Sequence, residues 1–117
     1  MQIYEERMAA NIRVLEPTGI LDGTQAEIFR KEVDTALEEG VDVLLIDLKD
    51  ITFVDSSGLG ILVVVLKKVR ACNKSLYVCS INEQVKMLFE LTSMDRVFEV
   101  LPDREAFAAK VESTLKA

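Results

Sequence analysis

The apolar positions of this chain follow two different periods, and their alternation predicts the order of its elements. Residues 42–48 and 75–81 are short apolar runs rich in β-branched and aliphatic side chains, which is typical of buried strands. Other stretches repeat an apolar residue every three or four positions, the period of a helix that buries one face. These stretches predict four helices, which begin near residues 22, 57, 82 and 102.

Weaker patterns fill the remaining segments. Residues 3–8 and 12–17 predict two short strands that form a hairpin, and residues 20–21 continue the second of them. Residues 49–53 are expected to be a connection, and residues 97–101 a last short strand. The second helix, residues 57–72, is apolar on nearly all sides, so we expect it to be buried under two layers or to offer a face to a partner.

Strands that alternate with helices are typical of an α/β domain with right-handed crossovers. We therefore expect a single domain over residues 1–117, with a mixed, mainly parallel sheet, about four helices and an N-terminal hairpin. A chain of 117 residues, 50% of them hydrophobic, can bury a core without disulfides or a metal.

Charge and composition exclude several function classes. The net charge of −6 argues against nucleic-acid binding, which usually needs a basic surface. No apolar run approaches the roughly 18 residues of a membrane span, and the first residues do not resemble a signal peptide. We therefore expect a soluble, cytoplasmic protein with no membrane or nucleic-acid partner.

The chain contains no histidine, which removes the Ser-His-Asp and Cys-His catalytic groupings, so we do not expect an enzyme. Its two cysteines, Cys72 and Cys79, are too few for a metal set. Free cysteines are commonly packed as small apolar residues, and we expect this of both. A Cys72–Cys79 redox pair is the minor alternative, because a reducing cytoplasm disfavours it.

One polar stretch, residues 54–60 (Val-Asp-Ser-Ser-Gly-Leu-Gly), separates a buried strand from the second helix. Asp55 and the two serines after it are residues that cap helices, so a purely structural role is one interpretation. A P-loop is excluded because no Lys-Ser or Lys-Thr follows the glycines. The third glycine of a dinucleotide-binding loop is missing too, and so is the first glycine of a nucleophile elbow.

The alternative interpretation makes Ser56 or Ser57 a substrate. Phosphorylation would add a charge of about −1.5 to −2. At a helix N-terminus that phosphate meets free N–H groups and the positive end of the helix dipole, so the domain could carry it without unfolding. A docked partner would feel the added charge and bulk, which makes such a serine a binding switch.

Residues 53–62 (Phe-Val-Asp-Ser-Ser-Gly-Leu-Gly-Ile-Leu) resemble the signature of the STAS domain, named for sulfate transporters and anti-sigma factor antagonists. The likeness is greatest to the stand-alone bacterial antagonists, and it covers nearly the whole chain. Residues 19–22, 45–48 and 85–89 support it.

The resemblance implies a cycle of partner exchange. The unphosphorylated protein binds an anti-sigma factor that is also an ATP-dependent serine kinase, the kinase phosphorylates Ser56, and a metal-dependent phosphatase resets the protein. ATP and Mg²⁺ belong to the kinase, so this chain needs no cofactor or metal, and a monomer is the default expectation. The implied partner-binding residues are those around Ser56, with Ser57 as a second capping hydroxyl: Asp22, Asp55, Ser57, Gly58, Leu59 and Gly60.

Three other functions stay open at this point. A receiver-like domain would use Asp47 as phosphate acceptor, but its acidic pair and its lysine are missing, and a cap or a salt bridge at the sheet edge suits Asp47 better. A module that senses a nucleotide or lipid could bind it with the glycine-containing residues 54–60. A scaffold, including a partner switch that does not involve a sigma factor, would use residues 54–60 only as a helix cap.

Overall fold

The computed structural model describes residues 11–116, with side-chain burial up to residue 112. The strands are β1 Ile12–Leu15, β2 Gly19–Leu21, β3 Val43–Asp47, β4 Ile51–Val54, β5 Ser75–Cys79 and β6 Val100–Leu101. The α-helices are α2 Gly23–Glu38, α3 Ser56–Ala71, α4 Glu83–Leu91 and α5 Arg104–Lys116, and a short 3₁₀-helix, η1, spans Met94–Arg96. The four predicted helices are thereby confirmed.

Two parallel sheets form the centre of the domain. The larger sheet has the strand order β1-β3-β5-β6, and the smaller one pairs β2 with β4. Every strand pair among residues 11–116 is parallel. The first strand of the predicted N-terminal hairpin, residues 3–8, lies outside the described residues.

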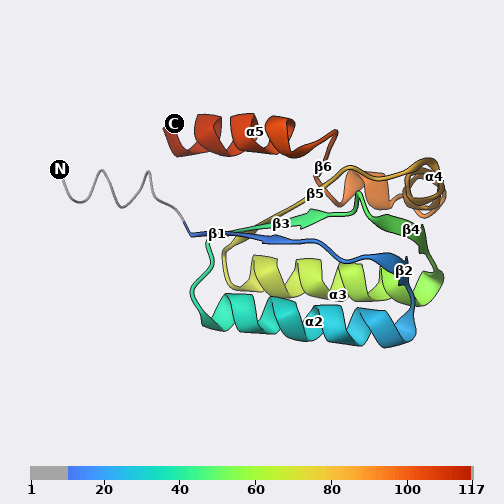
Figure 1. Ribbon diagram of the computed structural model, residues 1–117. Helices are drawn as coiled ribbons and strands as arrows, with labels where there is room; N and C mark the ends of the chain where they lie inside the picture. Colours follow the sequence, from blue (N-terminus) through green and yellow to red (C-terminus); the bar gives the residue numbers. More distant parts are fainter. Residues whose placement is uncertain (1–10, 117) are drawn as a thin grey trace.

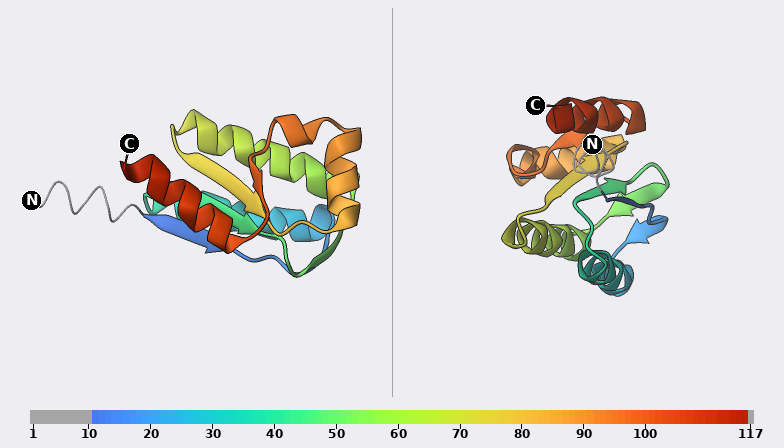
Figure 2. Two further views of the ribbon diagram at one scale, coloured as in Figure 1. Left: turned by 90° about the horizontal axis from the view of Figure 1, so that it is seen from above. Right: turned by 90° about the vertical axis from the view of Figure 1, so that its left-hand side faces the viewer.

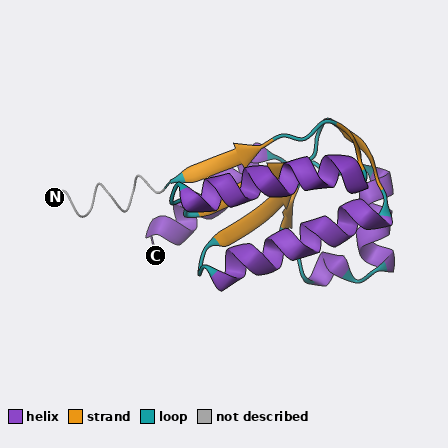
Figure 3. Cartoon of the chain, turned by 90° about the horizontal axis from the view of Figure 1, so that it is seen from below, coloured by secondary structure: helices purple, strands orange, loops and turns teal. Residues whose placement is uncertain are grey.

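Helices cover both faces of the larger sheet (Figure 1). On one face α2 and α3 pack side by side (Figure 3), and α5 lies across the other face (Figure 2). The main core fills the space between the sheet and α2 and α3, with Leu44, Ile46 and Leu62 fully buried. A second cluster under α5 contains Leu45 and Phe107.

The second helix is buried on most sides, as its sequence predicts. Leu62, Val65, Leu66 and Val69 are buried, and Val64 is 45% exposed. The helix α3 therefore packs against both the sheet and α2 and leaves the side chain of Val64 at the surface.

Three sequence predictions about strands were wrong. Residues 20–21, expected to continue the strand of residues 12–17, belong to β2, which lies in the other sheet. Residues 49–53 were expected to be a connection, but only Lys49 and Asp50 form a turn. Ile51–Val54 form β4, because they pair in parallel with β2. The burial of this strand does not alternate, since Thr52 and Phe53 are both exposed, which hid it from the pattern. The last strand is Val100–Leu101 and not residues 97–101, because the N–H groups of Val97 and Phe98 bond back to the carbonyl oxygen of Met94 in η1.

No helix among residues 11–116 is both long and apolar enough to cross a membrane.

The two cysteines are free thiols in different surroundings. Cys79 is buried, as predicted, and burial raises the pKa of its thiol. Cys72 lies exposed at the end of α3, so the expectation that it is packed was wrong. The helix ends there, and its apolar face no longer covers the side chain.

Thiol labelling tests this difference. In the native protein, Ellman's reagent should modify Cys72 quickly and leave Cys79 unmodified, because reaction needs an accessible thiolate. In denaturant both should react. Cys72→Ser is the control and should show no native reaction; rapid native labelling of that variant would contradict the burial of Cys79.

Candidate functional site

Two strand-to-helix turns lie side by side at one end of the molecule, where α2 and α3 both begin (Figure 1). The first turn joins β2 to α2, and the second joins β4 to α3. The Asp55 N–H donates to the carbonyl oxygen of Leu21 across 3.3 Å. A Cβ built on Gly23 would lie 3.8 Å from the Cβ of Ser57. The fold therefore brings Asp22 and residues 54–60, which are distant in sequence, to one surface.

An aspartate caps each helix at this surface. The Oδ1 atom of Asp55 accepts from the Gly58 N–H at 2.8 Å. The Oδ1 atom of Asp22 accepts from the N–H groups of Thr24 and Gln25, both at 3.1 Å. These bonds satisfy backbone donors that a helix start leaves free, so the structural interpretation of both aspartates as caps is confirmed.

The two serines are exposed and follow the capping residue directly. Among residues 11–116, neither hydroxyl has a hydrogen-bond partner, so Ser57 is not the second cap that the resemblance implied. Their N–H groups lie in the first turn of α3, where backbone N–H groups have no acceptor within the helix. The hydroxyl of Ser56 is therefore exposed and lies next to backbone donors that have no acceptor within the helix.

The three residues after the serines divide by burial. Gly58 is buried, and a Cβ at this position would lie 2.1 Å from the carbonyl oxygen of Leu21. Leu59 is only 8% exposed. Both therefore shape the turn from inside, and their implied part in partner binding stays a prediction. Gly60 is exposed and borders open space.

Asp47 occupies a different place and is not a free carboxylate. It is 1% exposed, and its Oδ2 atom accepts from Arg104 Nε at 2.7 Å. Burial opposes ionisation of this carboxyl, but the Arg104 bond and the Lys49 N–H bond outweigh it and lower its pKa. The predicted salt bridge at the sheet edge is confirmed, and an aspartyl-phosphate role has no accessible oxygen to use.

The comparisons with known proteins decide the family. A model of the STAS domain matches residues 5–113. The chain belongs to the STAS-domain family.

Its relatives include bacterial anti-sigma factor antagonists. The anti-sigma-B factor antagonist of Bacillus subtilis is 32% identical over 82 residues, which are 70% of this chain and 74% of that protein. A crystal structure from Thermotoga maritima aligns with a TM-score of 0.80 at 28% identity and covers 86% of each chain. The antagonist SpoIIAA in its unphosphorylated form shares the fold, with a TM-score of 0.70 at 20% identity over 83% of this chain and 85% of that one.

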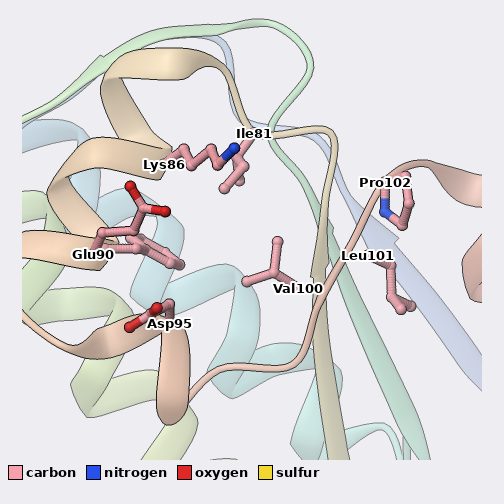
Figure 4. A pocket seen from close by; sticks show the side chains of 8 residues that line it. Ile81, Lys86, Glu90, Asp95, Val100, Leu101 and Pro102 are labelled. Atoms are coloured by element: carbon pink, nitrogen blue, oxygen red, sulfur yellow. The ribbon is translucent and has the colours of Figure 1, made fainter.

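This STAS domain also has a pocket of about 440 Å³ between α4, η1 and β6. Its floor is apolar, and Lys86, Glu90 and Asp95 stand at its margin, with the two carboxylates approaching from α4 and η1 (Figure 4). No residue of 54–60 lines it. A ligand in this pocket would therefore not contact residues 54–60, which the small-molecule alternative uses as its binding loop.

Sequence reasoning missed two residues that hold the start of residues 54–60, the serine loop of this STAS domain, on the side opposite β2. The side-chain amide of Gln84 bonds both the N–H and the carbonyl of Val54, at 2.9 Å each. Asn82, predicted only as a helix cap, also donates to the carbonyl oxygens of Ile51 and Thr52, at 3.1 and 3.2 Å. A glutamine in the first turn of an exposed helix carries no signal in sequence that it reaches another element.

Proposed function

We propose that this STAS domain is an anti-sigma factor antagonist controlled by phosphorylation. Its unphosphorylated form binds an anti-sigma factor that is also a serine kinase and so frees the factor's target. The kinase phosphorylates Ser56, the phosphorylated form dissociates, and a metal-dependent phosphatase restores it. The observation that carries this proposal is the exposed, unpartnered Ser56 hydroxyl directly after the cap of α3.

The position of Ser56 suits a modification that changes binding without unfolding the domain. A phosphate at the first turn of a helix is stabilised by free N–H groups and by the helix dipole. Asp55 already caps the Gly58 N–H, which leaves the N–H groups of Ser56 and Ser57 in the first turn as donors for an added phosphate. The core does not depend on this side chain, because Ser56 is exposed.

The surface around Ser56 explains why a phosphate would release a partner. Neither residues 19–25 nor residues 51–60 contain Lys or Arg, while Asp22 and Asp55 are both negative. Beside them, Ile20 and Phe53 are paired in register and are 51% and 44% exposed, which offers apolar area for docking. Two further charges at the edge of such a contact would lie unpaired against the partner.

We infer the docking residues from this arrangement. They are Asp22, Asp55, Ser57 and Gly60 around Ser56, with Gly58 and Leu59 fixing the turn beneath them. The named relatives support the role, since the Bacillus subtilis protein is an anti-sigma-B factor antagonist. SpoIIAA, which shares the fold, has been solved in a phosphorylated form as well.

Site-mapped intact mass of the protein from its own cells tests the switch. We expect a fraction heavier by one phosphate, located on Ser56. Ser56→Ala, used as bait, should retain a kinase that phosphorylates the wild type with ATP and Mg²⁺. Ser56→Asp should bind that kinase at least about tenfold more weakly, which corresponds to about 1.4 kcal/mol.

Ser57→Ala is the matched control, because it removes the neighbouring exposed hydroxyl. It should still accept phosphate at Ser56. Phosphate on neither serine under any growth condition, together with equal binding by Ser56→Ala and Ser56→Asp, would overturn the proposal and favour a scaffold in which residues 54–60 only cap α3.

A further inference from the structure

Gln84 lies outside the serine loop but is bonded to the residue that leads into it. Its Oε1 atom accepts from the Val54 N–H and its Nε2 atom donates to the Val54 carbonyl, both at 2.9 Å. We propose that Gln84 is a positioning residue for Ser56, which sets the direction in which the serine loop leaves β4. This inference rests on the proposed function and concerns how the same site is presented.

The geometry of β4 explains why one amide can make both bonds. The N–H and carbonyl of an extended residue point to the same edge of the strand, and a carboxamide carries one donor group and one acceptor group side by side. Gln84 thus does for β4 what a neighbouring strand would do. Asn82 occupies the carbonyls of Ile51 and Thr52, so α4 covers the edge of β4 that does not face β2.

The loop is consequently held from both sides at its first residues. On one edge Val54 is paired in register with Leu21 of β2. On the other edge its backbone is hydrogen-bonded to the side-chain amide of Gln84. Leu21 also accepts from the Asp55 N–H and lies against Gly58. Only Asp55 separates Val54 from Ser56, and its carboxylate must stay within hydrogen-bond distance of the Gly58 N–H to cap α3. A shift of Val54 would therefore move the cap and the serine hydroxyl together.

Positioning matters for phosphoryl transfer because a misplacement of about 1 Å can cost roughly a hundredfold in rate. A loop whose backbone is fixed offers the hydroxyl in one place. Without the Gln84 amide, Val54 would exchange its two bonds for water and the loop would sample several directions. The expected result is a loss in the catalytic step, with the fold kept.

The first test is amide hydrogen exchange at Val54, which needs no partner. In Gln84→Ala we expect exchange faster by roughly tenfold, because two ordinary hydrogen bonds are replaced by water. Gln84→Glu keeps the size and the acceptor of the side chain but sets a carboxylate against the Val54 carbonyl. The Val54 amide in this variant should exchange at least as fast as in Gln84→Ala. Glu90→Ala is the control on the same helix and should stay within about twofold of the wild type.

The second test measures Ser56 phosphorylation by the kinase retained on Ser56→Ala, with ATP and Mg²⁺. We expect Gln84→Ala and Gln84→Glu to lower kcat/KM by roughly tenfold, mainly through kcat, at a temperature where both are folded. Glu90→Ala should match the wild type. A lower melting temperature with unchanged kcat/KM would reduce Gln84 to a structural residue and overturn the inference.

The two tests separate this inference from the proposed function. Unchanged exchange at Val54 in Gln84→Ala overturns the clamp whatever the kinase does. If wild-type Ser56 accepts no phosphate, the proposed function fails and the positioning role falls with it, whereas the clamp on Val54 is still judged by the exchange measurement.

Discussion

Gly58→Ala should lower the free energy of unfolding by about 3 kcal/mol or more, at the upper end of the effects seen for overpacked sites. The added Cβ would lie 2.1 Å from the carbonyl oxygen of Leu21 and 3.0 Å from its carbonyl carbon. These are backbone atoms at the end of β2, paired with Val54 and Asp55, so they cannot move aside as a flexible side chain would. The better helix propensity of alanine, worth about 1 kcal/mol, offsets only part of this cost.

Gly60→Ala is the matched control, two residues further along the same helix. A Cβ there would meet no atom within 4 Å, and Gly60 has an ordinary negative φ. Alanine should therefore stabilise the protein by about 0.5–1 kcal/mol, through helix propensity alone.

Urea denaturation of the two variants and the wild type at neutral pH measures both effects. Opposite signs for the two glycines are expected. If both substitutions changed the free energy of unfolding by less than about 0.5 kcal/mol, the typical range for surface sites, the contact between Gly58 and Leu21 would be wrong.

The sequence predicted the parts of this protein that depend on local pattern. The period of apolar residues placed the four α-helices described among residues 11–116, and the residue types before them identified Asp22, Asp55 and Asn82 as caps. The exposed serines after Asp55 followed from the same local logic. The burial of Gly58 did not, because its cause is a contact with Leu21, more than thirty positions earlier. A glycine needed for packing and a glycine left open for a partner look the same in sequence.

The missed features share one physical cause, which is contact between elements distant in the chain. The strand β4 is short and its exposed pair, Thr52 and Phe53, breaks the alternation, so only its pairing with β2 defines it. Gln84 is recognisable only once α4 is seen against that strand's free edge. Arg104, at the start of α5, becomes important because the fold carries it to Asp47, 57 positions away.

Arg104→Met should lower the free energy of unfolding by about 2–3 kcal/mol at pH 7. The substitution keeps much of the side-chain volume but leaves Asp47, 1% exposed, with the Lys49 N–H at 3.1 Å and the Cys79 thiol as its polar partners. Removing one partner of a fully buried pair costs about 3–5 kcal/mol, and the expected cost is lower here because Arg104 itself is half exposed. Glu16 also loses its ion pair with Arg104, at the surface.

The pH dependence of this loss distinguishes a buried charge from lost packing. In the wild type the pKa of Asp47 is below its usual value, so its ionic contribution is present above the unfolded pKa and is lost as pH falls through the folded one. In Arg104→Met, burial is no longer outweighed, so the folded pKa of Asp47 should rise above the unfolded value, and protonation then favours the folded state. The difference in stability between the two proteins should therefore narrow as pH falls from 7 towards about 4.

The double variant Asp47→Asn/Arg104→Met provides the control, since its amide has no charge to leave unpaired. The difference between its free energy of unfolding and that of the wild type should not become smaller as pH falls, because it has no Asp47 carboxylate to titrate. A surface contribution from Glu16 is shared by both variants. Urea denaturation across this pH range measures the three proteins together. If Arg104→Met showed the same deficit at every pH, its cost would come from packing of α5 against the sheet, and the Asp47 carboxylate would contribute nothing to holding that helix in place.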